Sequence, residues 1–217
     1  NALAQFGYGV PSQIKMKKNY MGRTPLWVKF FWGDGETKFP QSQANTISKN
    51  EIVYPGGNHI EFRTSAFTAG GLCTGCVKIK SGDVFNKNKY SPPFYASFYA
   101  DDDNRGAIKF DDWKAATADA GNGFDKNSSE LKEVTPTRTF VVPNDYENGR
   151  GHLAVFNWDG SSSVTANLSK VVSNGQNFRV LDAHNVFGAP VVSGVYQGPV
   201  DIPMGGKEFG AFLILVN

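Results

Sequence analysis

Apolar and polar residues alternate along short segments in the first half of the chain. Ile14 and Met16 flank one lysine, and Val77 and Ile79 flank another. A period of two residues places successive side chains on opposite faces of an extended backbone. These segments are therefore predicted to be strands with one apolar face.

The strand-like segments recur at a nearly constant interval. Two sets of apolar residues are spaced by 31 or 32 residues, namely Phe30, Phe62 and Phe94, and Met16, Ile47, Ile79 and Phe110. A period of about 20 to 50 residues is typical of solenoids, propellers and arrays. Because the repeating unit consists of strands, the spacing predicts a parallel β-helix over residues 13–110, with the three phenylalanines pointing inward on top of one another.

Residues suited to tight bends recur with the same period. Asn19 and Asn50 each stand three residues after a member of the second apolar set, and Gly82 occupies the third such place. Asparagine and glycine both tolerate a left-handed backbone. We expect these positions to form a bend in every turn of the stack, where stacked asparagines can hydrogen-bond in a ladder.

The pattern changes near Pro136. One helix is predicted over 111–118 before this point, and six strands are predicted after it, over 138–142, 151–158, 163–168, 177–182, 190–196 and 208–216. Dipeptides typical of hairpin turns lie between them, at Asn148-Gly149, Asp159-Gly160, Asn174-Gly175 and Gly205-Gly206. The last strand is apolar on both faces, which predicts a central position. We therefore expect two domains, residues 1–135 with the strand repeats and residues 136–217 as an antiparallel sheet or small sandwich.

Several segments resemble a known family. Residues 138–158, 178–196, 202–204 and 208–209 resemble the C-terminal module of bacterial secreted proteins with right-handed parallel β-helix repeats. Residues 108–117 and 124–128 resemble the helix-bearing segment that follows the last turn of the β-helix in these proteins. The resemblance covers residues 108–217 and implies a right-handed, pectate-lyase-like β-helix. It carries over no catalytic residue. Family members usually have many turns before this segment, whereas about three precede it here.

Composition and charge argue against some classes of function. The 217 residues carry a net charge of +2 without a block of Lys or Arg, so nucleic-acid binding is not expected. No apolar run reaches the roughly 18 residues of a membrane span. The chain begins at Asn1 rather than Met, which we interpret as a processed or trimmed product. The chain start itself does not indicate secretion; it is the resemblance that implies a secreted or cell-surface protein.

The two cysteines, Cys73 and Cys76, form a CxxC motif among glycines. A redox motif normally opens a helix after a strand, and a zinc site needs two further ligands, which His59, His152 and His184 do not supply at suitable spacing. A local disulfide in an exported protein is the favoured interpretation.

Candidate ligand-binding residues fall into three groups. Oxygen-rich Asp101, Asp102 and Asp103 are candidate Ca²⁺ ligands, although a solvated acidic loop is the more common meaning of such a run, and no other cofactor is indicated. Aromatic rings outside the two apolar sets are candidates for stacking on sugars, namely Trp27, Trp32 and Tyr54. Basic residues on outward strand positions are candidates for lining a groove, namely Arg63, Lys78 and Lys80. The candidate carboxylates for acid–base catalysis are Asp34, Glu61, Asp83, Asp103 and Asp111, and the sequence does not choose among them.

Three functions remain open from the sequence. The first is a polysaccharide lyase or glycoside hydrolase of which this chain is the C-terminal portion. The second is a non-catalytic carbohydrate-binding or adhesion protein, and the third is a structural surface protein. Because solenoids need capped ends and residues 1–12 form no amphipathic helix, we expect the first turn to stack on an N-terminal fragment of the same precursor or on another subunit.

Overall fold

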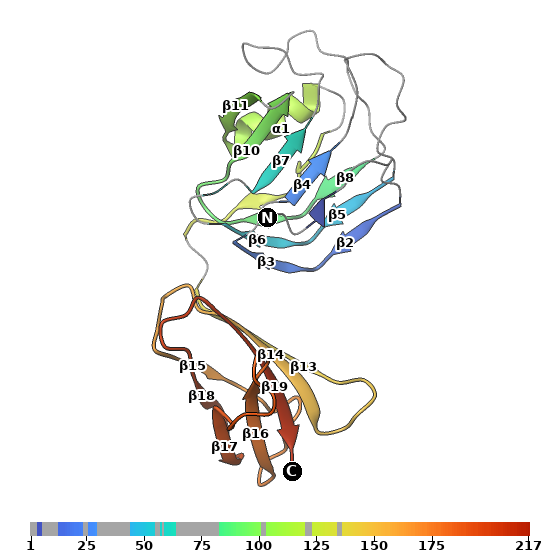
Figure 1. The fold of residues 1–217 in the computed structure, drawn as a ribbon. Helices are drawn as coiled ribbons and strands as arrows, with labels where there is room; N and C mark the ends of the chain where they lie inside the picture. The colour runs from blue at the N-terminus through green and yellow to red at the C-terminus, as the bar shows by residue number, and fades with distance from the viewer. Residues whose placement is uncertain are drawn as a thin grey trace. The chain divides into compact units, whose positions relative to one another are not determined.

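The computed structural model describes residues 4–5, 13–23, 26–29, 44–54, 57, 59–63, 83–100, 103–119, 123–133 and 136–217, with only the backbone at 4–5, 26–29, 61–63, 96–100, 103–107, 116 and 119. The described part consists of strands joined by turns, with a single α-helix, so the protein is all-β (Figure 1). The chain divides into two compact units, Asn1–Val134 and Thr135–Asn217.

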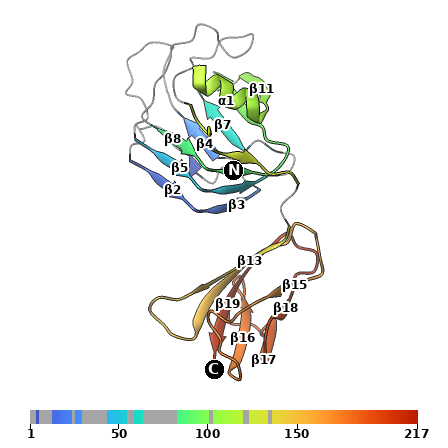
Figure 2. The same ribbon diagram turned by 180° about the vertical axis from the view of Figure 1, so that it is seen from behind.

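The first unit contains three sheets built mainly from parallel strands (Figures 1 and 2). Sheet 1 consists of β2 (Lys15–Lys17), β5 (Thr46–Ser48) and β8 (Val84–Asn86). Sheet 2 consists of β3 (Tyr20–Gly22), β6 (Glu51–Val53), β9 (Lys89–Tyr90) and β12 (Ser129–Glu130). Sheet 3 consists of β1 (Ala4–Gln5), β4 (Leu26–Lys29), β7 (Ile60–Arg63), β10 (Ala96–Ala100) and β11 (Asp103–Ile108), of which only β11 is antiparallel to its neighbour.

The chain visits these sheets in a fixed order. Strands β2, β3 and β4 form repeat 1, β5, β6 and β7 form repeat 2, and β8, β9 and β10 form repeat 3. Each strand pairs in parallel with the equivalent strand of the next repeat. Stacked strand repeats are therefore present in the first unit, whereas their closure into a right-handed β-helix stays a prediction.

The observed register corrects the predicted apolar sets. Met16 pairs with Ile47 as predicted, 31 residues on, but Ile47 pairs with Phe85, 38 residues on, and not with Ile79. Seven more residues are needed for the second repeat because the connections before and after its sheet 3 strand are longer than those of the first. The prediction that Ile79 completes this set is therefore wrong.

The phenylalanine set is wrong for the same reason. The register partners of Phe62 are Val28 and Phe98, so neither Phe30 nor Phe94 stacks on it. Phe94 is buried immediately before β10. Phe30 lies outside the described residues, and the orientation of the Phe62 side chain stays a prediction.

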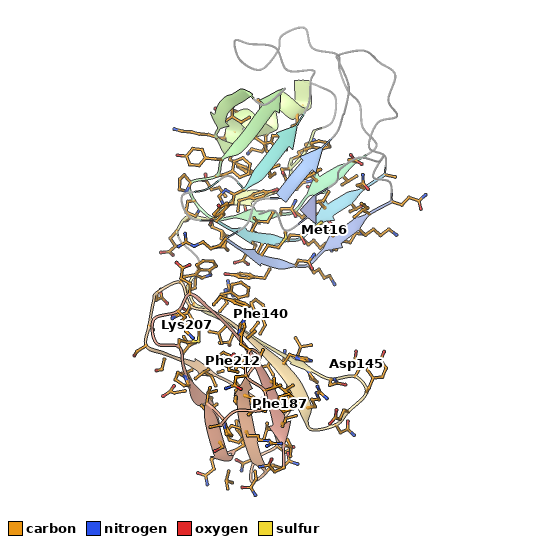
Figure 3. All side chains as sticks on the ribbon, viewed as in Figure 1. Met16, Phe140, Asp145, Phe187, Lys207 and Phe212 are labelled. Atoms are coloured by element: carbon orange, nitrogen blue, oxygen red, sulfur yellow. The ribbon has the colours of Figure 1, made fainter. Side chains whose placement is uncertain are left out.

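Apolar side chains from the sheets and the helix form the core of the first unit. The buried members are Met21, Ile47, Ile52, Ile60, Phe85, Tyr90, Phe94, Phe110, Trp113 and Phe124. Ile14 and Met16 of repeat 1 pack against this core while partly exposed; Figure 3 labels Met16. Alternation in the sheet 1 strands thus directs their middle residues, Met16, Ile47 and Phe85, toward this core.

The single helix, α1 (Phe110–Asp119), confirms the prediction over 111–118. Asp111 and Asp112 lie in its first turn, where acidic side chains interact favourably with the helix dipole. Trp113 is 1 % exposed and packs in the core with Phe124. The helix therefore closes part of the core that the strands leave open.

The second unit is a two-layer antiparallel structure. Its larger sheet has the order β13 (Arg138–Pro143), β14 (Arg150–Phe156), β19 (Phe209–Val216), β16 (Asn177–Asp182) and β17 (Val192–Val195), and its smaller sheet pairs β15 (Ser163–Ala166) with β18 (Val200–Pro203). Both sheets contribute to one core, which includes Leu153, Val164, Ile202 and the Phe212 labelled in Figure 3. The central position predicted for the last strand is confirmed.

All six predicted strands of this unit are present, and a seventh, β18, was not predicted. Pro199 precedes this strand and Pro203 ends it, and prolines this close together are more typical of a turn than of a strand. Both strands of a two-stranded sheet are edge strands, where proline is tolerated.

Asn148-Gly149 joins the paired strands β13 and β14, which confirms this hairpin; Gly149 has a φ of 76°, and a Cβ there would lie 3.0 Å from Val216. The dipeptides Asp159-Gly160, Asn174-Gly175 and Gly205-Gly206 form turns between strands of different sheets, so the hairpins predicted there are wrong.

Candidate functional site

The corner between sheets 1 and 2 has the same conformation in all three repeats. Lys18, Lys49 and Lys87 follow β2, β5 and β8, and their φ angles of 60°, 59° and 57° are left-handed. An asparagine follows each lysine, giving Lys18-Asn19, Lys49-Asn50 and Lys87-Asn88. Each Lys-Asn pair therefore forms a bend, in which the lysine is exposed and the asparagine is buried at Asn50 and Asn88 but exposed at Asn19.

The asparagines of these bends hydrogen-bond in a ladder. The backbone N–H and the Nδ2 of Asn19 both donate to Oδ1 of Asn50, at 3.0 Å each. Asn50 donates in the same way to Oδ1 of Asn88, at 3.1 and 3.2 Å. The predicted ladder is confirmed for Asn19 and Asn50, but its third member is Asn88 and not Gly82, which lies outside the described residues.

The ladder ends on a buried carboxylate, Asp125. Asn88 Nδ2 donates to Oδ1 of Asp125 at 3.0 Å, and the Ser128 hydroxyl donates to the same oxygen at 2.5 Å. The Tyr90 hydroxyl and Trp113 Nε1 donate to Oδ2, at 2.8 and 3.0 Å. Since a carboxylate only accepts, Asp125 terminates a chain in which every step donates toward the C-terminal end.

A second ladder runs along the start of sheet 1. The backbone N–H of Ile14 donates to Oδ1 of Asn45, and both the N–H and the Nδ2 of Asn45 donate to Oδ1 of Asp83, at 2.9 Å in each case. Asp83 is 6 % exposed. It had been a candidate acid or base on sequence grounds, but its burial and its donors make it a structural acceptor.

A histidine joins sheets 2 and 3. His59 is fully buried, stacks on Phe94, and has its Nε2 2.9 Å from the Ser91 hydroxyl, while its Nδ1 accepts from the Tyr95 N–H at 3.4 Å. Burial lowers the pKa of His59 from 6.5 to about 4. The Ser91 hydroxyl beside this neutral, buried imidazole also accepts a hydrogen bond from the Tyr54 N–H. We therefore assign His59 a structural role.

The lysines of the corners face outward. Lys18, Lys49 and Lys87 are exposed, and none of their ammonium groups bonds to another described residue. Backbone bonds from Lys18 N–H to Ser48 O and from Lys49 N–H to Asn86 O, both 3.2 Å, keep adjacent corners in contact. We call these three residues the lysine column.

The lysine column works against stability in two ways. A side chain other than glycine costs about 1–2 kcal/mol at a left-handed position. Ammonium groups on neighbouring strands about 5 Å apart repel each other by about 1 kcal/mol per pair in water. Gln13, Arg23, Ala44 and Asp125 have a similar left-handed φ, so the backbone cost is not specific to the column. Exposed cations at equivalent positions of three stacked repeats make the column the strongest candidate site among the described residues.

No known family matches this chain, and neither the curated proteins nor the solved structures contain a match to it. In the described part of the chain, no helix is long and apolar enough to cross a membrane.

A sequence signal for the lysine column existed and was missed. The dipeptide Lys-Asn occurs at 18–19, 49–50, 87–88 and 126–127, once for each pass of the chain. The fourth copy follows Asp125, whose N–H donates to Phe85 O, and the Asn127 N–H donates to Asn86 Oδ1. The exposed Lys126 therefore lies beside the corner that holds Lys87.

The structure describes few of the sugar-binding candidates proposed from the sequence. Tyr54 is half-buried, and Trp27 and Arg63 lie in β4 and β7, where only the backbone is described. Trp32, Lys78 and Lys80 lie outside the described residues. Their role in binding sugars stays a prediction.

The calcium and disulfide candidates have the same status. Asp103 begins β11, without a described side chain, and Asp101 and Asp102 are outside the described residues, as are Cys73 and Cys76. Among the side chains that are described, no three His, Cys, Asp or Glu residues gather closely enough to hold a metal ion. Asp111 is exposed and pairs with Lys114 at 2.9 Å.

Proposed function

We propose that this chain belongs to an extracellular, polysaccharide-directed protein and that its first unit is a right-handed parallel β-helix. The observation that carries the proposal is the register of the repeats. Equivalent outward side chains recur one strand apart, about 4.8 Å, along a line that crosses three repeats. A surface that repeats in one dimension is complementary to a polymer that repeats in one dimension.

The ladders support this proposal because they make the surface rigid. Asn50 and Asn88 are each 1 % exposed, and the steps from Asn19 to Asn50 and from Asn50 to Asn88 each join the backbone of one repeat to a side chain of the next. Corners held in this way keep their outward side chains at a constant spacing, which reduces the entropy lost when a polymer binds.

Catalysis is a separate question from binding. The carboxylates at the ladder ends, Asp83 and Asp125, are buried and engaged in hydrogen bonds. We therefore propose binding as the primary role of the described surface, with lyase or hydrolase activity as the alternative in which the cleft involves residues outside the described part.

A screen of linear polysaccharides tests the proposal. The full chain is incubated with neutral and acidic polymers, and binding is measured by affinity electrophoresis while reducing ends and unsaturated sugars are assayed in the same samples. We expect retention by at least one linear polysaccharide. New chain ends would add catalysis, and absence of retention across both classes would contradict the proposed function.

Assembly is a second candidate function, favoured by the edge strands. Among the described strands, β2 is one edge of sheet 1 and β3 is one edge of sheet 2, both in repeat 1, and edge strands present backbone groups to a further strand. We propose that a further β-strand repeat, from an N-terminal fragment of the same precursor or from another subunit, stacks there. Light scattering coupled to size-exclusion chromatography would contradict this if only a 23.7 kDa monomer were found over a wide concentration range.

A further inference from the structure

We propose that the lysine column, Lys18, Lys49 and Lys87, binds a linear anionic polysaccharide whose sugars carry carboxylate or sulfate groups. This inference rests on the proposed function and adds the substrate class and the binding residues. It predicts that charge, and not only the shape of the polymer, decides which polysaccharide is retained.

The geometry of the corners supports a row of cationic groups. The three residues have φ angles within 3° of one another and follow equivalent positions of parallel, in-register strands, so their Cα–Cβ bonds leave the stack in similar directions. Backbone bonds between successive corners hold them one strand apart. A row of equivalent cations at constant spacing is complementary to a polymer with one negative charge per repeating unit.

Neighbouring residues extend the positive surface. Lys15 and Lys17 of β2, Lys89 of β9 and Lys126 are all exposed around the column. The buried acids Asp83 and Asp125 point into the ladders and do not neutralise it from the surface. The acids on sheet 2 are Glu51, which is half-buried, and Glu130, whose Oε1 accepts from the Phe94 N–H at 2.6 Å.

The lysines have no structural role that explains their side chains. Glycine or asparagine would adopt the left-handed backbone more readily than lysine, and the ladder uses the following asparagine. The ammonium groups form no hydrogen bond or ion pair within the described residues. Charge is therefore the property that lysine contributes at these positions.

The choice of lysine also bears on the kind of anion. Arginine binds phosphate with two parallel hydrogen bonds and is preferred where phosphate geometry is recognised, whereas lysine acts as a flexible point charge. Lysine and not arginine stands at all three positions of the column. A point charge imposes no bidentate geometry, so it suits a single carboxylate or sulfate on each repeating unit of a polysaccharide.

Matched polymers and matched variants test the inference on the full chain. Dextran and dextran sulfate differ in sulfate alone, alginate supplies carboxylates, and single-stranded DNA supplies phosphates. The variant Lys18→Gln/Lys49→Gln/Lys87→Gln removes the column. The control Lys109→Gln/Lys170→Gln/Lys207→Gln removes three exposed lysines elsewhere, of which Lys207 is labelled in Figure 3, and changes the net charge equally.

We expect the unaltered chain to bind dextran sulfate or alginate, with weaker binding at higher salt, and not to bind dextran. The column variant should bind roughly tenfold more weakly or worse, and its salt dependence should be shallower because fewer counterions are released. The control should change affinity by less than about threefold, since exposed charges away from a site contribute little. Lys18→Arg/Lys49→Arg/Lys87→Arg should retain binding, and Lys18→Gly/Lys49→Gly/Lys87→Gly should lose it while keeping the wild-type circular dichroism spectrum.

The outcomes separate this inference from the proposed function. Equal binding of dextran and dextran sulfate, or equal losses in the column and control variants, would overturn the column but leave polysaccharide binding intact. Tighter binding of single-stranded DNA than of either anionic polysaccharide would overturn it in favour of a nucleic-acid partner. Failure of all polysaccharides to bind would overturn both. The relative affinities of alginate and dextran sulfate identify the anion.

Discussion

Tyr90 donates its phenolic hydrogen to Oδ2 of Asp125 over 2.8 Å, and this bond joins sheet 2 to the segment that follows α1. Burial, followed by the charge of Asp125, raises the pKa of Tyr90 well above its usual value of 10.0. Trp113 of α1 donates to the same oxygen, and the asparagine ladder reaches the other one. Asp125 is thus the point where a sheet, the helix and the ladder meet.

Asp125 is expected to be among the residues most sensitive to substitution. Asp125→Ala would leave the donors of Tyr90, Trp113 and Asn88 without an acceptor in a buried site, so we expect a loss of about 3–5 kcal/mol in the free energy of unfolding. Urea denaturation measures the change. Asp112→Ala, at an exposed position of α1, is the matched control and should cost under about 1 kcal/mol. Similar losses for the two variants would contradict this role.

The interior of the asparagine ladder should matter more than its end. Asn50 accepts two bonds from Asn19 and donates to Met16 O and Asn88 Oδ1, and it is 1 % exposed. Asn50→Ala should therefore cost about 2–4 kcal/mol, whereas Asn19→Ala, at the exposed end, should cost about 1 kcal/mol. Thermal and urea unfolding compare the two variants. A larger loss for Asn19 would refute the directional ladder.

Acid should destabilise the fold through His59. Its folded pKa of about 4 is lower than the ordinary 6.5, so the unfolded chain binds the proton more readily. The stability that the neutral imidazole contributes is complete above pH 6.5, falls by about 1.4 kcal/mol per pH unit below it, and levels off near pH 4 after a loss of about 3 kcal/mol.

The difference in unfolding free energy between the wild type and His59→Asn, measured from pH 7 to pH 4, tests this expectation. It should shrink steadily over that range. His184→Asn, at an exposed site, is the control and should leave the pH dependence of the wild type in place. A wild-type advantage over His59→Asn that stays constant across the range would show that His59 is not the group responsible.

Cys73 and Cys76 are expected to be bonded to each other. The motif lies among glycines in a protein that we propose to be exported, and such a short loop adds only modest stability. Intact mass measured after alkylation without reductant should show no modified thiol, and two should appear after reduction. Two alkylated cysteines in the unreduced exported protein would instead support a metal or redox role.

The sequence by itself determined the class of structure. Alternation along Ile14–Met16, recurring Asn19 and Asn50, and glycine-containing turns such as Asn148-Gly149 are local features, and local sterics govern the conformations that they favour. The strand repeat, the helix at 110–119 and six strands of the second unit could therefore be predicted, since each follows from a pattern within a few residues.

Only the tertiary structure decided which residues meet. Phe85 and not Ile79 stacks on Ile47, because the connections between sheets differ in length from one repeat to the next. A longer connection leaves the alternation within the strands unchanged, so the sequence pattern does not reveal it. The varying length of the connections also prevented the prediction of Asn88 and Asp125 as ladder members, since the bonded partners are 37 to 38 residues apart. The outward direction of the lysine column likewise depends on a left-handed backbone, which lysine seldom adopts and which stacked hydrogen bonds impose here.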